Sequence, residues 1–379
     1  MRTVLFSLAV AIALICSMPA RAGEHLPVFV LHSYSQEYPW TKRQHEGFLN
    51  AFAMDGVWRL APSVEYLDTK RVDYTPEYAA RMADYLGWKY RGYQPEVIYV
   101  TDDNALDFAI QHLTRLFPRA AIFFSGVNNL DLSDTLDAGR VTGVFEYKDI
   151  GPNLALMRMI APDIRDILVV GDASETFQAI RADIGRELRD RPDIRAHYIS
   201  RRSLPALVDD LRGRSERFVF LTTLGAIADA DGQPVPLADT LDAIVAAGPF
   251  TVFSMEDGYV QRGVLGGFVT SGERQGAAAA QQVLLHLQGS PVDMIPALPS
   301  SPNEYLIDAG ELAQAGLALP AAIAQQTRFL NKPPSFYARY QTFILTALYA
   351  LAALFLLSLF GSLLVVLRRA CSVAHNRSS

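Results

Sequence analysis

Polar side chains that could bind a small solute follow most of the short apolar runs in this sequence. The run 28–31 is followed by a histidine, a serine and a tyrosine, and the run 97–100 by a threonine and two aspartates. Hydroxyl groups, carboxylates and aromatic rings bind small polar molecules through hydrogen bonds, ion pairs and ring contacts. The predicted ligand contacts are His32, Ser33, Tyr34, Trp40, Thr101, Asp102, Asp103, Ser125, Gly126, Asn128, Glu146, Asp172, Thr222, Thr223, Glu256 and Asp257.

Several of these candidates have a structural role as an alternative. Asp103 and Asp172 are equally suited to capping the helix that follows each of them. Gly126 suits a tight turn, and His32 suits packing inside the protein as well as lining a cleft. Trp40 either covers a ligand as an aromatic lid or packs against its neighbours. The residue types alone leave these alternatives open.

Sequence signatures of catalysis are weak or absent. The chain has no G-x-S-x-G turn, no phosphate-binding Walker loop and no H-E-x-x-H zinc motif. Residues 229–232 resemble the start of a calcium loop, but Thr240 stands where a bidentate acid should close it. We therefore expect a protein that is not an enzyme and that needs neither a cofactor nor a metal ion.

The apolar runs alternate with longer segments of helical period, which is typical of parallel sheets flanked by helices. Strands are expected at 28–31, 64–67, 97–100, 121–124, 141–145, 167–170, 196–199, 218–221, 250–253, 265–270 and 304–307. Helices are expected at 42–54, 77–90, 104–116, 150–160, 175–189, 204–211, 237–246 and 273–288. The predicted fold class is α/β, and the candidate contacts stand at the carboxyl ends of the strands, where such sheets bind ligands.

Two successive series of strands and helices predict two lobes. The first lobe is expected at residues 23–140, completed by about 264–290, and the second at residues 141–263, completed by about 303–330. A length of about 318 residues between the apolar ends suffices for two hydrophobic cores. If the lobes face each other, their polar strand ends meet at a cleft.

Both ends of the chain are apolar and predict membrane targeting. Residues 1–22 have the positive start, apolar stretch and small-residue ending of a secretory signal peptide. Cys16 lacks the small residues before it that lipid attachment requires. Residues 343–367 contain no charged residue over 25 positions, and the roughly 37 Å of helix that they form suffices to span a bilayer. A connector with two prolines is expected at 331–342.

The charges around this span predict its orientation. Arginines follow it at 368, 369 and 377, and no acid does, so the positive-inside rule puts the tail 368–379 in the cytoplasm. The expected localisation is the inner (cytoplasmic) membrane, crossed once, with the ligand-binding part in the periplasm.

The exported part is acidic and contains no cysteine. Five of the 34 basic residues lie in the two ends, whereas all 40 acidic residues lie between them, which leaves a net charge of about −11 and disfavours nucleic acid as a partner. Both cysteines, Cys16 and Cys371, also lie in the ends. Disulfides, thiolate metal sites and cysteine nucleophiles are therefore excluded between them.

Several segments, in order along the chain, resemble one protein family. They are residues 30–34, 38–41, 65–71, 102–105, 124–128, 141–144, 266–273 and 301–305. Together they resemble the ABC-transporter substrate-binding family with a type 1 periplasmic-binding fold. The likeness covers residues 27–317 and is greatest to the branch that serves as the extracytoplasmic sensor domain of histidine kinases and diguanylate cyclases.

This resemblance implies two lobes that close on a small solute, such as an amino acid or similar metabolite, without turnover. By position it assigns ligand contacts to Ser33, Tyr34, Asp102, Asp103, Ser125, Asn128, Glu146, Thr222 and Glu256. The chain departs from the family in two ways. Free importer components lack a membrane span, and sensors of this branch continue into a kinase or cyclase, for which residues 368–379 are too few.

The resulting hypothesis is a membrane-anchored solute sensor or receptor that signals through a membrane partner or through an output domain not contained in this sequence. The alternative is the substrate-binding component of an ABC importer, whose partner is a permease. A periplasmic enzyme is disfavoured because catalytic signatures are missing. The identity of the ligand is left open.

Overall fold

The computed structural model describes the backbone of residues 25–375 and the side chains of residues 25–365. The predicted signal peptide, residues 1–22, lies outside the described residues. The chain divides into two compact units, of which the first ends at Leu330 and the second begins at Asn331.

Five parallel strands form the sheet of the first lobe, in the order β2-β1-β3-β4-β5. Their bounds are β1 His25–His32, β2 Arg59–Tyr66, β3 Val97–Thr101, β4 Ala121–Val127 and β5 Val141–Phe145. The helical elements between them are α2 Pro39–Asp55, α3 Pro76–Lys89, α4 Asp102–Phe108, the π-helix η1 Ala109–Leu113, α5 Thr114–Leu116 and the 3₁₀ turn η2 Leu130–Asp134. Because helices cover both faces, strands such as β3 and β4 are continuous apolar runs.

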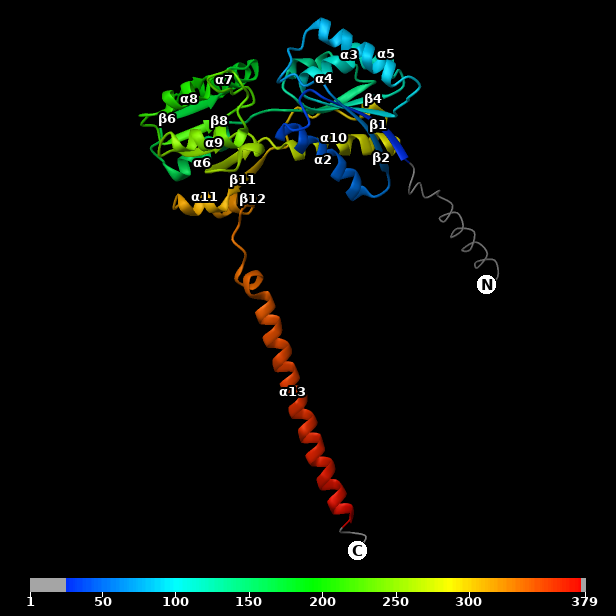
Figure 1. Ribbon diagram of the computed structural model, residues 1–379, viewed down its shortest axis with the longest axis vertical. Coiled ribbons are helices and arrows are strands. Elements are labelled where there is room, and N and C mark those ends of the chain that lie inside the picture. Colours follow the sequence, from blue (N-terminus) through cyan, green and yellow to red (C-terminus); the bar gives the residue numbers. More distant parts are fainter. Residues whose placement is uncertain (1–24, 376–379) are drawn as a thin grey trace, which may run out of the picture. The chain divides into compact units, whose positions relative to one another are not determined.

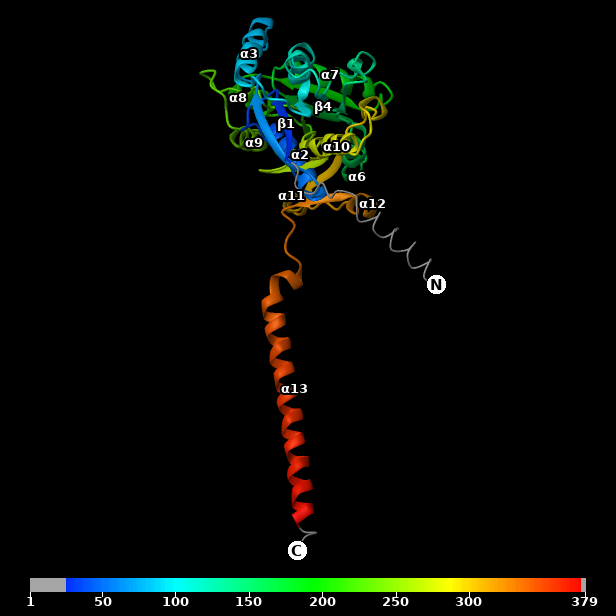
Figure 2. The same cartoon turned by 90° about the vertical axis from the view of Figure 1, so that its right-hand side faces the viewer.

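The strand β1 divides the apolar interior of this lobe into two cores. Phe29 and Leu31 face a core that they share with α3 and α4, whereas Val28 and Val30 face a core that they share with α2 and α10 (Gly272–Leu287). This division follows from the two-residue period of a strand. The helix α10 comes late in the sequence but lies beside α2, as Figure 1 and Figure 2 show.

Seven strands form the sheet of the second lobe, in the order β12-β11-β10-β9-β8-β6-β7, and all pairs are parallel except β10 with β11. Their bounds are β6 Asp166–Gly171, β7 Arg195–Ser200, β8 Phe218–Leu221, β9 Thr251–Ser254, β10 Val264–Val269, β11 Glu304–Asp308 and β12 Thr327–Leu330. The helical elements of this part of the chain are α6 Gly151–Ile160, α7 Glu175–Leu188, α8 Leu204–Leu211, α9 Leu237–Ala246, η3 Asp257–Tyr259, η4 Val292–Met294, α11 Ala309–Gln314 and α12 Ala321–Ala324.

Three strands differ from the sequence-based expectation. The sequence predicts that residues 141–145 open the second lobe, but β5 pairs with β4 and completes the first sheet. It also places 264–270 in the first lobe, but β10 pairs with β9 and β11 in the second sheet. An apolar run predicts a strand without predicting its neighbours. The short strand β12 was missed because its four residues, only partly buried, form no apolar run.

Within residues 25–330 the chain crosses between the lobes three times, at 146–150, 270–271 and 299–303. Gln275 of α10 binds to the end of β5, just before the first crossing, and to the third crossing. Its side-chain nitrogen donates to the carbonyl oxygen of Phe145 at 3.1 Å and to the hydroxyl of Ser301 at 2.9 Å. Its side-chain oxygen accepts the backbone N–H of Gly126 at 3.1 Å. The crossings are therefore held side by side, as a hinge requires.

Two glycines let α2 and α10 approach each other at backbone distance. A Cβ atom at Gly47 would lie 2.0 Å from the carbonyl oxygen of Glu273, and one at Gly276 would lie 1.9 Å from the carbonyl oxygen of Gln44. No side chain fits into either space. This contact places the start of α10, which follows a crossing segment, next to the start of α2.

The second unit contains one long helix, α13 (Phe336–His375), preceded by residues 331–335. Its part Phe336–Val365 is long and apolar enough to cross a membrane, which agrees with the predicted span. The helix begins before the expected position 343, so the connector predicted at 331–342 is helical from Phe336 onwards.

A methyl group at Gly276 should destabilise the first lobe. In Gly276→Ala the new Cβ meets the carbonyl oxygen of Gln44, so α2 and α10 must move apart. We expect the free energy of unfolding to fall by about 1–3 kcal/mol, as overpacking typically costs. Urea unfolding of the full chain in detergent measures this loss.

Gly87→Ala is the matched control, because Gly87 lies inside α3 and its Cβ would meet no atom within 4 Å. Alanine is favoured over glycine in a helix by roughly 0.5–1 kcal/mol, so this variant should be at least as stable as the wild type. Equal stability of the two variants would contradict the close contact of α2 and α10.

Candidate functional site

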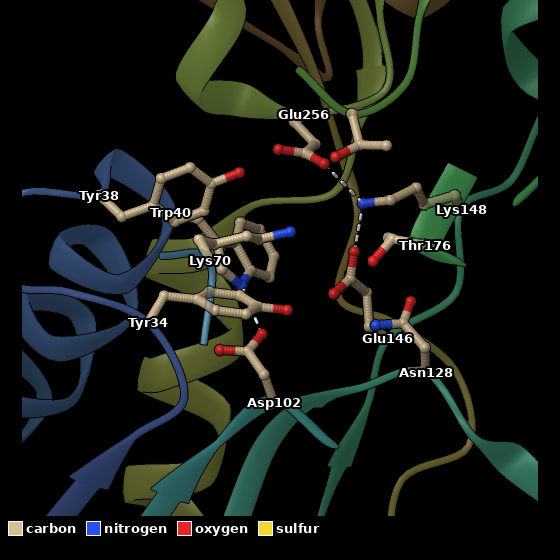
Figure 3. A pocket seen from close by; sticks show the side chains of 11 residues that line it. Tyr34, Tyr38, Trp40, Lys70, Asp102, Asn128, Glu146, Lys148, Thr176 and Glu256 are labelled. Atoms are coloured by element: carbon tan, nitrogen blue, oxygen red, sulfur yellow. Dashed lines mark hydrogen bonds and ion pairs between the residues drawn. The ribbon is translucent and has the colours of Figure 1, made fainter. Parts of the chain in front are cut away.

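A small polar cavity lies between the two lobes, near the carboxyl ends of their strands (Figure 3). Its free space is about 20 Å³, which is room for roughly one water molecule. Each lining residue stands in the loop or first helical turn that follows a strand. The lining residues are Tyr34, Tyr38, Trp40, Lys70, Asp102, Asn128, Glu146, Lys148, Thr176, Thr223 and Glu256.

Asp102 is a buried carboxyl group of this cavity. It starts α4 in the left-handed backbone region, with φ of 66°, which aspartate tolerates better than most residues. Its Oδ1 accepts the indole N–H of Trp40 at 2.8 Å, whereas Oδ2 is buried without a hydrogen-bond partner in the described part of the chain. Burial raises the pKa of Asp102 well above its ordinary value, and the nearby Glu146 raises it further. A buried acceptor without a donor is costly, so Oδ2 is available to a ligand donor.

Lys148 is buried between two carboxylates. Its ammonium pairs with Glu146 on its own crossing segment and lies 3.2 Å from Oε1 of Glu256, which follows β9 (Figure 3). The same ammonium lies 5.5 Å from the ring centroid of Trp40. Burial lowers the pKa of Lys148, but the two carboxylates more than compensate, and its pKa lies above the ordinary value. Lys148 therefore stays charged and is already neutralised by its partners.

Lys70 is a cation of the cavity whose ammonium lies beside two aromatic rings. Its ammonium lies 4.6 Å from the ring centroid of Tyr34 and 5.7 Å from that of Tyr38. No carboxylate lies within 4 Å of it among the residues described. Such cation–π contacts stabilise a charge without neutralising it. The cavity thus presents one ammonium without a counter-ion and one carboxyl oxygen without a donor, beside three aromatic rings.

A larger groove of about 580 Å³ adjoins the cavity. Tyr34, Asn128, Lys148 and Thr176 line both spaces. The groove continues between the loop after β4 and the start of α7, where Asp131 and Glu175 lie. It provides the space through which the part of a ligand outside the cavity can extend.

Seven of the predicted contacts line the cavity. They are Tyr34, Trp40, Asp102, Asn128, Glu146, Thr223 and Glu256. Tyr38, Lys70, Lys148 and Thr176 also line it and were not among the predicted contacts. Lys148 and Thr176 stand three and five residues after their strands, beyond the positions from which contacts were predicted. Lys70 follows β2, which ends at Tyr66, and no contact was predicted after this strand.

His32, Ser33 and Thr101 lie beneath the cavity and do not line it. The ring of His32 stacks on Tyr66 with centroids 5.2 Å apart, bonds to the hydroxyl of Thr101 at 3.0 Å, and has its pKa lowered by burial. The hydroxyl of Ser33 accepts the backbone N–H of Ala105 at 2.8 Å. These residues therefore support the loops that carry Tyr34 and Asp102.

Ser125, Gly126 and Thr222 are also engaged inside the protein. The hydroxyl of Ser125 bonds to that of Tyr99 at 2.7 Å. Gly126 has a φ of 72°, the left-handed conformation that a tight turn with glycine uses. The hydroxyl of Thr222 donates to a carbonyl oxygen of β6 at 3.1 Å.

Three predicted aspartates accept hydrogen bonds from the protein itself instead of lining the cavity. Asp103 accepts backbone N–H groups of the loop after β4 and faces the outer groove. Asp172 accepts the backbone N–H of Ala226 at 2.8 Å. Asp257 accepts the hydroxyl of Ser271 at 3.1 Å and lies 3.6 Å from Arg43.

The buried Asp257 should make stability depend on pH. Burial raises its pKa to about 6, so the folded protein retains its proton where the unfolded chain has lost it. Its contribution to the free energy of unfolding therefore falls as the pH rises from about 4 to 6. We expect the difference between wild type and Asp257→Asn to fall by about 2 kcal/mol over this range. Urea unfolding at several pH values measures it, and a difference that is constant with pH would contradict the expectation.

No protein family model and no curated protein matches the sequence. Solved structures do match. A substrate-binding protein with adhesive properties from Clostridium difficile, in its ligand-free open form, has a TM-score of 0.58 at 14% identity, over 81% of this chain and 100% of that one. The ABC domain from Streptococcus pneumoniae in complex with L-tryptophan has a TM-score of 0.56 at 13% identity, over 81% and 99%.

A conserved domain protein from Vibrio cholerae has a TM-score of 0.56 at 16% identity, over 81% of this chain and 99% of that one. Identities this low bear on the fold alone. With two sheets of mainly parallel strands joined by three crossings, this chain has the fold of the type 1 periplasmic substrate-binding proteins.

Proposed function

We propose that this protein is a membrane-anchored receptor that binds a small zwitterion of the amino-acid type reversibly between its lobes. The fold is that of non-catalytic solute-binding proteins, and it implies that a small solute binds in the cleft. The proposal adds the class of the solute and the role of the bound state, which is to signal to a membrane partner.

The observation that carries this proposal is the pair of uncompensated groups in the cavity. Oδ2 of Asp102 has no donor and the ammonium of Lys70 has no counter-ion in the described residues. An α-amino acid supplies both partners, because its ammonium can donate to Asp102 while its carboxylate pairs with Lys70. Lys148 cannot replace either partner, since Glu146 and Glu256 already neutralise it.

The rings around the cavity suit the rest of such a ligand. Tyr34 and Tyr38 meet edge to face with centroids 5.4 Å apart, and Trp40 is held by its hydrogen bond to Asp102. Aromatic walls bury apolar parts of a ligand and also stabilise cations on their faces. The adjoining groove leaves space for a side chain.

Binding requires the lobes to move. The free space of about 20 Å³ is far below the roughly 300–1,000 Å³ of ligand pockets. Asp102 and Trp40 belong to the first lobe, whereas Thr223 and Glu256 belong to the second. A ligand that contacts both sets favours the closed arrangement by its differential affinity for that arrangement. The change in the lobes is the signal that we assign to this receptor.

A ligand screen tests the proposal. The full chain in detergent is heated with each of the twenty amino acids, with deaminated and amidated analogues of each, and with sugars and purines. We expect stabilisation by at least one amino acid, of about 2.7 kcal/mol at a hundredfold excess over its dissociation constant. The analogue without the ammonium and the one without the carboxylate should both stabilise less. Stabilisation by sugars alone would contradict the proposed class.

Asp102→Asn should weaken binding of the stabilising amino acid at least about tenfold, because a charge-assisted hydrogen bond to the ammonium is lost. Asparagine keeps the size of the side chain and tolerates the left-handed backbone. Asp107→Asn is the control, since Asp107 lies exposed on the same helix and binds Tyr74 outside the cavity. Isothermal titration calorimetry measures both variants, and equal affinities would contradict the role of Asp102.

A further inference from the structure

Outside the cavity, the buried carboxylate of Glu304 is held by two arginines. Its side chain is 4% exposed. Oε2 lies 2.9 Å from Arg274, and Oε1 lies 2.7 Å from Arg328, whose Nε also donates to both oxygens. We call Arg274, Glu304 and Arg328 the clamp. A carboxylate at this depth needs a cationic partner, because burying it unpaired is strongly destabilising.

The clamp joins the two lobes. Arg274 stands in the first turns of α10, which packs on α2 and belongs to the first lobe. Glu304 starts β11, and Arg328 stands in β12, both in the second sheet. The ion pair between Arg274 and Glu304 therefore spans the lobes. A rotation of the lobes that separates α10 from β11 must lengthen or break it.

A continuous series of contacts leads from the cavity to the clamp. Glu256 lines the cavity, and its neighbour Asp257 accepts the hydroxyl of Ser271 at 3.1 Å. The same hydroxyl accepts the backbone N–H of Arg274 at 3.3 Å and so caps α10. Arg274 then pairs with Glu304. Each step is a direct bond or contact between packed groups.

The clamp ends on the strand that leads to the membrane helix. Among the residues described, the strand β12 is the outermost of its sheet and pairs only with β11. It ends at Leu330, and residues 331–335 separate it from α13. An edge strand with one neighbour opens more easily than a central one. The ion pair of Arg328 with Glu304 adds a side-chain anchor to the four backbone-paired residues of this strand.

We infer that the clamp transmits lobe movement to β12 and from there to the chain that enters α13. The inference rests on the proposed receptor function and adds the route of the signal. Closure of the lobes sets the position of Arg274, Arg274 determines how firmly Glu304 is held, and Glu304 anchors Arg328 in β12. The part of the structure that changes state is the edge strand β12. It is either fully paired with β11 or frayed.

Amide hydrogen exchange of residues 327–330 tests this inference in the full chain in lipid nanodiscs. We expect Arg274→Gln, a change in the first lobe, to accelerate exchange in β12 about fivefold, the effect of losing roughly 1 kcal/mol. Arg274→Lys keeps the charge and should restore most of the protection. The inference would be overturned if the amides of β12 exchanged at the same rate in Arg274→Gln as in the wild type.

Arg262→Gln is the matched control, because Arg262 forms an exposed ion pair with Asp242 within the second lobe. It should leave exchange in β12 unchanged, and equal acceleration in both variants would overturn the inference by showing a general loss of stability.

The same exchange experiment is repeated with a mixture of the twenty amino acids, each at about 1 mM. We expect the mixture to slow exchange in β12 of the wild type and not of Arg274→Gln, although it raises the melting temperature of both. Stabilisation of the wild type without slower exchange in β12 would overturn the inference. A mixture without any effect would count against the proposed ligand class, whereas the comparison of Arg274→Gln with Arg262→Gln would still decide the role of the clamp.

Discussion

The free-energy cost of burying a charge decides which charged groups of the cleft must be paired. Lys148 is buried between the lobes and stays charged because Glu146 and Glu256 both face it. With Lys148 engaged by these two carboxylates, Asp102 has no cationic partner among the residues described, and burial raises its pKa. The ligand that fits best is one that brings a cation to Asp102 without disturbing Lys148. The charge balance of the cavity is therefore the basis of the proposed class of solute.

The two sheets supply the geometry that this balance requires. Parallel strands end at a common edge, so loops from β1, β3, β4 and β5 meet those from β8 and β9. The backbone contact at Gly47 and Gly276 fixes α10 against α2. Because α10 follows a crossing segment and carries Gln275 and Arg274, the same helix connects the first lobe with the hinge and with the clamp. The helix α10 thus lies between the cavity and β11 of the second sheet, which it contacts through Arg274.

Much of the fold follows from the sequence by local rules. Apolar runs predicted all the strands except β12, since a strand buried on both faces is a continuous apolar run. The end of each run then indicated the rim of the cleft, and the uncharged stretch 343–367 indicated the long apolar helix that the structure contains. Sheet membership was predicted less well. The apolar run of β5 fits either sheet, and only its pairing with β4 decides.

Which rim residues reach the cavity was decided by tertiary structure alone. Asp102 lines it whereas Asp103 faces the outer groove, and Glu256 lines it whereas Asp257 binds Ser271. Neighbours of the same type diverge because successive side chains leave the backbone in different directions, here where α4 and η3 begin, and composition does not contain that direction. The pairing of Lys148 with Glu256 joins residues far apart in the sequence, so it exists only once the lobes face each other. The sequence determined where polar groups gather, and folding determined which of them remain without a partner.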